Sequence, residues 1–240
     1  MNRLRSLRPH LALAAKVAAG ASTTTAGIFY LQTRNCRFEH FDPNTDGYFF
    51  EHGLFAQVNP WNKPYSADSC VREVPFEQLD ERLLEDAKNG GTELIERFMQ
   101  GLWGGPGYAI QRRIMEFTMN ETNKTDVWSR EGLLKSKYDP GTFITNHFLV
   151  VSKTPKSIFM RGCFDPHPSP PIPQNVDNIV EITTDIDHEK RVATLKLRVA
   201  TFDGTKAASE AEDPFGGFGG WLHHRYSTAL VESGARNCMN

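Results

Sequence analysis

Two segments that lie close together in the sequence, residues 178–187 and 191–202, alternate apolar and polar side chains, and this alternation restricts the possible folds more than any other pattern. Successive side chains of a strand point to opposite faces of its sheet. One face would carry Val180, Ile182, Thr184, Ile186, Ala193, Leu195, Leu197 and Val199, and the other Glu181, Asp185, Lys196 and Arg198. We expect an antiparallel hairpin, turning at His188-Glu189, with one buried face and one face in water.

A second hairpin is predicted earlier in the chain. Thr142–Val151 and Ser157–Cys163 are rich in β-branched and aromatic residues, and a short loop at residues 153–156 separates them. Val71–Phe76 is predicted as a further short strand, which Pro75 restricts to an edge or an end. Together these segments indicate an antiparallel sheet.

Helices are expected before the hairpins and at the end of the chain. Helical spacing of apolar residues occurs at Leu79–Ala87, 94–102, Tyr108–Phe117 and Trp221–Asn237. Asn89-Gly90-Gly91 should end the first of these helices, Thr92 should cap the second, and the glycines at 104–107 should end it. The sequence therefore predicts an α+β domain in which a helical region precedes a curved antiparallel sheet and a long C-terminal helix covers a cavity.

The last helix has an unusual inward face. At 100° per residue, Leu222, Tyr226, Ala229 and Ser233 point in one direction, whereas His224 and Glu232 point elsewhere. This face is small and mixed instead of a continuous leucine stripe. It suits a helix that covers a sheet and leaves space beneath it.

Composition excludes some classes of function. With 27 basic and 29 acidic side chains there is no excess of cations to neutralise a phosphate backbone, so nucleic acid is not an expected partner. The cysteines occur singly, at Cys36, Cys70, Cys163 and Cys238, without the C-x-x-C pairs of zinc sites. We expect neither a metal nor a cofactor.

The first 36 residues form a separate segment. They contain Arg3, Arg5, Arg8 and Lys16, and the first acidic residue of the chain is Glu39. This bias is typical of a mitochondrial transit peptide, but the segment also has the length of a membrane anchor. A cleaved secretory signal, with Ala19-Gly20-Ala21 as a small-residue cleavage site, and a disordered tail are further alternatives. Residues 37–69 are expected to form an irregular aromatic segment that wraps a domain spanning residues 70–240.

Candidate site residues follow from these placements. Tyr226 and His223 on the last helix, and His147 in the predicted strand Thr142–Val151, are the side chains that could serve as an acid or a base. Tyr226, Leu222 and Ser233 are expected to contact a ligand from the inner face of the helix, and Arg161 could hold a carboxylate.

The order of elements resembles the START-like (SRPBCC, helix-grip) superfamily, in which a curved sheet wraps a C-terminal helix around a cavity. Four segments, TRNCRFEHF, CVREVP, GLWGGPGYAIQRR and WLHHRYSTALVESGARN, also resemble a group of fungal proteins of uncertain function. The first resemblance implies a cavity for an apolar molecule such as a sterol, a quinone or a polyketide.

Three functions remain open at this point. The protein could bind or transfer a small hydrophobic or amphipathic metabolite or lipid. It could be a cofactor-independent cyclase, dehydratase or isomerase of fungal secondary metabolism. Alternatively, it could be a membrane-tethered or mitochondrial assembly factor without a small ligand, associated with a membrane through its N-terminus.

Overall fold

The computed structural model describes residues 27, 29–41, 46–61, 66–207 and 217–240. The chain divides into two compact units, Met1–Asn35 and Cys36–Asn240. The predicted targeting or anchoring segment, residues 1–36, lies almost entirely outside the described residues. Among the residues that are described, no helix is long and apolar enough to span a bilayer.

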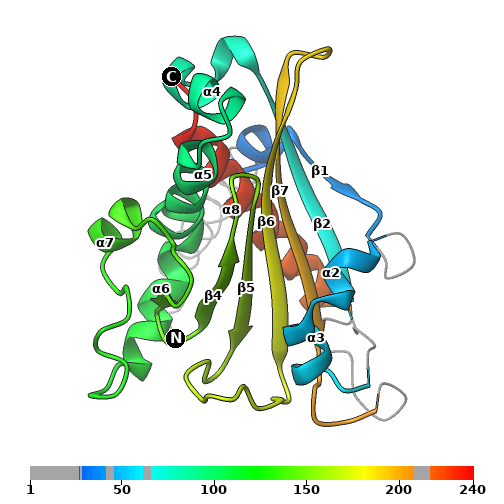
Figure 1. Cartoon of the computed structure of the whole chain (residues 1–240), viewed down its shortest axis with the longest axis vertical. Helices are drawn as coiled ribbons and strands as arrows, with labels where there is room; N and C mark the ends of the chain where they lie inside the picture. Colours follow the sequence, from blue (N-terminus) through cyan, green and yellow to red (C-terminus); the bar gives the residue numbers. More distant parts are fainter. Residues whose placement is uncertain (1–26, 28, 42–45, 62–65, 208–216) are drawn as a thin grey trace, which may run out of the picture. The chain divides into compact units, whose positions relative to one another are not determined.

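In its described residues, the second unit is built on one antiparallel sheet of seven strands in the order β1-β2-β7-β6-β5-β4-β3. The strands are β1 (Cys36–Glu39), β2 (Ser66–Pro75), β3 (Phe143–Ile144), β4 (Phe148–Lys153), β5 (Ser157–Cys163), β6 (Asp177–Asp187) and β7 (Val192–Phe202). The C-terminal helix α8 (Phe218–Asn237) crosses one face of this sheet (Figure 1). The chain therefore has the predicted α+β architecture, with the arrangement of a helix-grip fold.

The β6–β7 hairpin is confirmed together with its apolar face. Val180 pairs with Val199 and Ile182 with Leu197, and all four side chains are buried in the main core beneath the helices. This face, called the inner face below, positions the cavity.

The earlier hairpin is confirmed between β4 and β5, but the prediction of one continuous strand at Thr142–Val151 is wrong. The chain reverses direction at residues 145–147, so that β3 pairs with β4. Thr145 and Asn146 take the left-handed conformation there, with φ of 49° and 54°. A short polar run can make such a turn because asparagine tolerates this conformation. His147 consequently lies on a turn instead of a strand.

The predicted helices are present. They are α4 (Glu81–Lys88), α5 (Glu93–Gly104), α6 (Ala109–Met115) and the C-terminal helix α8. The described part of the chain adds an unpredicted helix, α7 (Arg130–Lys135), and three 3₁₀ turns at Phe76–Gln78, Pro106–Tyr108 and Glu116–Thr118. Thr92 does not cap α5 with its side chain. The Glu93 N–H at the start of this helix instead donates to Asp86 Oδ2 at 2.8 Å. A carboxylate from the end of α4 thus takes the capping role.

Helices α5 and α8 approach each other closely through glycine. A Cβ atom on Gly101 would lie 2.8 Å from Gly234 Cα, and one on Gly234 would lie 2.5 Å from the Phe98 ring. The small face of α8 therefore packs against α5 at this end, and the space expected beneath the helix does not extend there. Glu232, expected to lie off the inward face of α8, is buried and pairs with Arg72 of β2 at 3.2 Å.

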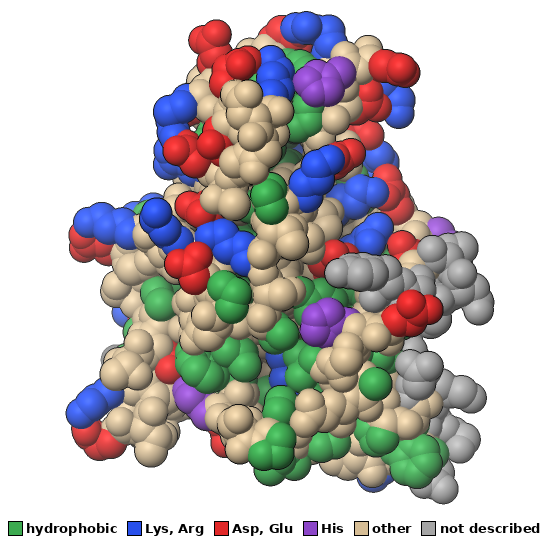
Figure 2. Space-filling view, in the orientation of Figure 1, with side chains coloured by type: hydrophobic (Ala, Val, Ile, Leu, Met, Phe, Trp, Pro, Cys, Tyr) green, Lys and Arg blue, Asp and Glu red, His purple; other side chains and the backbone are tan. Residues whose placement is uncertain are grey.

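The outer face of the sheet is only partly in water. Helices α2 (Gly47–Glu51) and α3 (Gly53–Val58) lie across one end of it, on the side opposite to α8 (Figure 1). Their Phe49 and Phe55 rings contact Phe159 and Phe202 at 5.4 and 5.3 Å between centroids. Figure 2 shows hydrophobic side chains in the lower part of this view and charged side chains in the upper part, over α4 and the β6–β7 turn.

Two features of the predicted domain organisation need correction. Residues 37–69 were expected to lack regular structure, but they contribute β1, α2, α3 and the start of β2. Their aromatic side chains do pack on the domain, as predicted. A boundary at Cys70 would cut through β2, so the folded unit begins at Cys36.

Candidate ligand cavity

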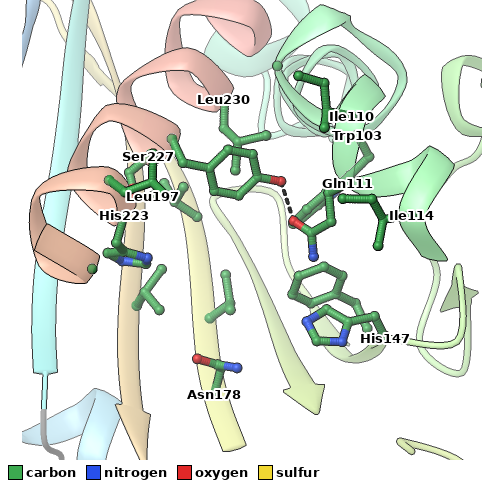
Figure 3. A pocket seen from close by; sticks show the side chains of 17 residues that line it. Trp103, Ile110, Gln111, Ile114, His147, Asn178, Leu197, His223, Ser227 and Leu230 are labelled. Atoms are coloured by element: carbon green, nitrogen blue, oxygen red, sulfur yellow. Dashed lines mark hydrogen bonds between the residues drawn. The ribbon is translucent and has the colours of Figure 1, made fainter. Parts of the chain in front are cut away.

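A cavity of about 570 Å³ lies between the inner face of the sheet, helix α6 and the first half of α8 (Figure 3). Its apolar walls include Trp103, Phe148, Val180, Leu197, Val199 and Leu230. Ile110, Ile114 and Leu222, which also line it, are 77%, 60% and 54% exposed. The cavity is therefore apolar inside and reaches the surface between α6 and α8.

The glycine-rich break after α5 makes this cavity possible. A Cβ atom on Gly107 would lie 2.7 Å from the Ala229 carbonyl oxygen, so only glycine allows the chain to pass this close to α8. Beyond that contact the chain continues into α6, which carries Ile110, Gln111 and Ile114 along the cavity. The motif predicted as a helix stop thus also positions one wall of the site.

Tyr226 and Gln111 form a hydrogen-bonded pair inside the cavity. The Tyr226 hydroxyl donates to Gln111 Oε1 at 2.5 Å (Figure 3). Burial raises the pKa of Tyr226 well above its usual value, so the phenol stays protonated and acts as a donor. Because its oxygen is engaged in this way, the Gln111 amide presents its nitrogen toward the part of the cavity that holds His147 (Figure 3).

His147 is a neutral histidine at the cavity wall. Burial lowers the pKa of its imidazole to about 4. Nδ1 is buried and has no hydrogen-bond partner among the described residues. In Figure 3 one ring nitrogen points into the cavity and the other points away from it. Because Nδ1 is the buried nitrogen, Nε2 is the one that can meet a ligand.

A second imidazole is paired with a carboxylate. His223 Nε2 lies 2.8 Å from Oδ2 of Asp68, a buried residue of β2. Because an ionised carboxylate can only accept, this contact places a proton of the imidazole on Nε2 and orients the ring. His223 lines the same cavity as His147, Gln111 and Tyr226.

Four of the predicted site residues come together here, and two do not. Tyr226, His223, His147 and Leu222 all line the cavity. Ser233 does not, because it lies further along α8 and donates to the Gly101 carbonyl oxygen at 2.8 Å in the helix contact.

Arg161 does not line the cavity either. Its guanidinium is buried on the outer face and forms two hydrogen bonds to Asp177, from Nε to Oδ1 at 2.9 Å and from Nη2 to Oδ2 at 2.6 Å. Burial raises the pKa of Asp177 despite this pairing. The expectation that Arg161 holds a ligand carboxylate is therefore wrong, because its partner is a carboxylate of the protein itself.

Sequence reasoning did not identify the polar lining residues Gln111, Asn178 and Ser227, nor Asp68 as the partner of His223. Asn178 and Asp68 occupy inner-face positions two residues before Val180 and Cys70, so strand alternation carried the signal for both. Gln111 lies on a short helix with no clear apolar stripe, and nothing in the sequence singled it out.

Among the described residues that line the cavity, none is a lysine or an arginine. Within the described parts of the chain, no group of three or more His, Cys, Asp or Glu side chains is arranged to hold a metal ion. Searches of protein-family models, of curated proteins and of solved structures found no match to the chain.

Proposed function

We propose that the protein binds a small hydrophobic or amphipathic molecule in the cavity between the sheet and α8, as a binding or transfer protein. The observation that carries this proposal is an apolar cavity of about 570 Å³ that contains a few neutral polar groups. Ligand sites commonly have volumes of about 300–1,000 Å³ and the same combination of apolar walls and few polar groups. Transfer of apolar surface from water into such walls supplies the binding free energy.

The exposed apolar side chains at the rim support the same proposal. Ile110, Ile114 and Leu222 form part of the cavity lining and are also accessible from outside. An apolar molecule that enters between α6 and α8 would therefore meet apolar surface along its path. The predicted mitochondrial or membrane location depends on residues 1–36 and is a separate proposal.

The test is to purify the full chain, extract it with organic solvent, and analyse the extract by mass spectrometry. We expect an apolar compound at close to one molecule per chain. The matched variants are Leu197→Trp, which fills the cavity, and Thr183→Trp, which places the same side chain on the outer face of β6. The compound should be absent from the first variant and present in the second. Equal amounts in both variants would place it outside the cavity.

The His223–Asp68 pair favours a second candidate function, acid–base catalysis without a cofactor. A histidine whose tautomer is fixed by a buried carboxylate is suited to remove a proton from a bound molecule and return it elsewhere. This is the step that an isomerase, a cyclase or a dehydratase requires. Tyr226 is less suited to be the base, because its raised pKa keeps it protonated.

Hydrogen exchange would test this second function. The extracted compound is incubated with the protein in deuterated water, and deuterium at its carbon atoms is measured by mass spectrometry. We expect His223→Ala and Asp68→Asn to slow the incorporation at least tenfold, while His224→Ala, which changes the neighbouring exposed histidine, should leave it unchanged. Equal rates in all variants and in a protein-free control would rule out proton transfer by this pair.

A further inference from the structure

The polar groups at one end of the cavity specify the chemistry of the ligand more closely. Gln111 and His147 come from different elements, α6 and the β3–β4 turn, and both line the cavity. The Gln111 amide nitrogen has no hydrogen-bond partner among the described residues, since only its oxygen is engaged, by Tyr226. In Figure 3 this nitrogen and the inward ring nitrogen of His147 lie on the same side of the cavity.

These two groups have complementary hydrogen-bonding roles. The amide nitrogen of Gln111 can only donate. The His147 ring is neutral, so only one of its nitrogens carries a proton; with that proton on the buried Nδ1, the inward Nε2 carries the lone pair and accepts. One donor and one acceptor on the same side of an apolar cavity match a hydroxyl group, which accepts from the amide and donates to the imidazole.

The remaining lining disfavours an anionic ligand. No lysine or arginine of the described chain lines the cavity, and the guanidinium of Arg161 is paired with Asp177 on the other face of the sheet. A carboxylate moved from water into these walls would lose its hydration without gaining a cationic partner. The Asp68 carboxylate that pairs with His223 would further disfavour a second negative charge.

From this arrangement we infer that the ligand is an apolar alcohol, whose neutral hydroxyl group binds between Gln111 and His147. This inference rests on the proposed binding function. The cavity should therefore bind apolar alcohols more tightly than fatty acids, and more tightly than apolar molecules that lack a hydrogen-bond donor.

The test uses three probes with the same chain, decanol, methyl decyl ether and decanoic acid, at about pH 8, where the acid is ionised. Their affinities are measured with the full-length protein by displacement of the neutral fluorophore N-phenylnaphthylamine. Decanol should bind about fivefold more tightly than the ether, because the ether cannot donate to His147. Decanoate should bind at least about tenfold more weakly than decanol, because its charge has no partner.

Two variants locate the effect, and two matched variants serve as controls. In His147→Phe and in Gln111→Met, the preference for decanol should be lost, so that decanol and the ether bind with about equal affinity. The same substitutions at an exposed histidine and an exposed glutamine, His188→Phe and Gln57→Met, should leave the wild-type preference unchanged. Comparing two ligands within each variant cancels any general loss of stability.

The outcomes separate the inference from the proposed function. If decanoate binds as tightly as decanol, or if both cavity variants keep the full preference for the alcohol, the inference is wrong and the cavity still binds apolar molecules. If the fluorophore and all three probes fail to bind the folded protein, the proposed function is wrong, and the inference falls with it.

Discussion

Acidification should destabilise this protein through His147, and the size of the effect can be worked out from its burial. The imidazole has a pKa of about 4 in the folded protein because burial disfavours its charged form, compared with 6.5 for an exposed histidine. Between these two values the unfolded chain binds a proton that the folded chain does not. Stability is therefore unaffected above about pH 7 and falls as the pH is lowered.

The expected loss follows from proton linkage. At pH 5 it amounts to about 2 kcal/mol, and below pH 4 it approaches about 3 kcal/mol, the full value of a shift of about 2.5 pH units. Other groups titrate in the same range, so the measured quantity is the difference in unfolding free energy between the wild type and His147→Phe. This difference should change by about 2 kcal/mol between pH 8 and pH 5, in favour of the variant.

Urea unfolding followed by circular dichroism, at intervals from pH 8 to pH 5, would measure this difference. His188→Phe is the control, because His188 is exposed on the β6–β7 turn. A wild-type-minus-variant difference that stays constant within a few tenths of a kcal/mol would refute the reasoning. It would mean that the imidazole is solvated in the folded protein and can take up a proton there.

Three further predictions concern the helix contact, the outer face and the cavity. Gly101→Ala should destabilise the fold by about 1–3 kcal/mol in urea unfolding, because the added Cβ would lie 2.8 Å from Gly234 Cα. The cost of this overpacking exceeds the gain in helix propensity of about 1 kcal/mol. A variant more stable than the wild type would contradict the close contact between the two helices. Arg161→Met should lower the unfolding free energy by about 3–5 kcal/mol, because it leaves the Asp177 carboxylate buried without its partner. The affinity of the variant for N-phenylnaphthylamine should be unchanged. Weaker probe binding would indicate that Arg161 does contribute to the cavity. Tyr226→Phe should weaken decanol binding by about 1 kcal/mol in the displacement assay, because Gln111 loses the hydrogen bond that orients its amide. An unchanged affinity for decanol would exclude this orienting role of Tyr226.

The architecture could be predicted where a single local pattern decides the structure. Period-two alternation in residues 178–202 identified both strands of the β6–β7 hairpin and the members of its buried face. Regular apolar spacing identified α5, and the glycines after it marked its end. These signals depend only on which side of a strand or helix is apolar, so they do not require knowledge of the partner element.

The errors arose where a distant part of the chain determines the environment. Residues 181–198 alternate as a half-solvated strand should, but nothing in that alternation reveals that α2 and α3 cover one end of the outer face. Arg161 looked available for a ligand because its partner, Asp177, lies in the next strand, beyond a proline-rich loop. Ser233 was placed on the correct side of α8, but the sequence does not show where α5 fills the space beneath that helix.

The candidate site was accessible to sequence reasoning only in part. Tyr226 was found because it lies on the inner face of a long helix, and His223 was named only as a histidine of the same helix. Their partners Gln111 and Asp68 lie more than a hundred residues away in the sequence, at separations of 115 and 155. Pairings over such distances are products of tertiary packing, and one sequence without its fold carries no signal for them.

Titration of the full-length protein with N-phenylnaphthylamine tests the central claim, that the space beneath α8 is a binding site for apolar molecules. The wild type and the outer-face variant Thr183→Trp should show saturable emission at close to one probe per chain, and Leu197→Trp, which fills the cavity, should abolish it. Saturable binding that persists unchanged in a folded Leu197→Trp variant, or no binding to the folded wild type, would contradict the claim.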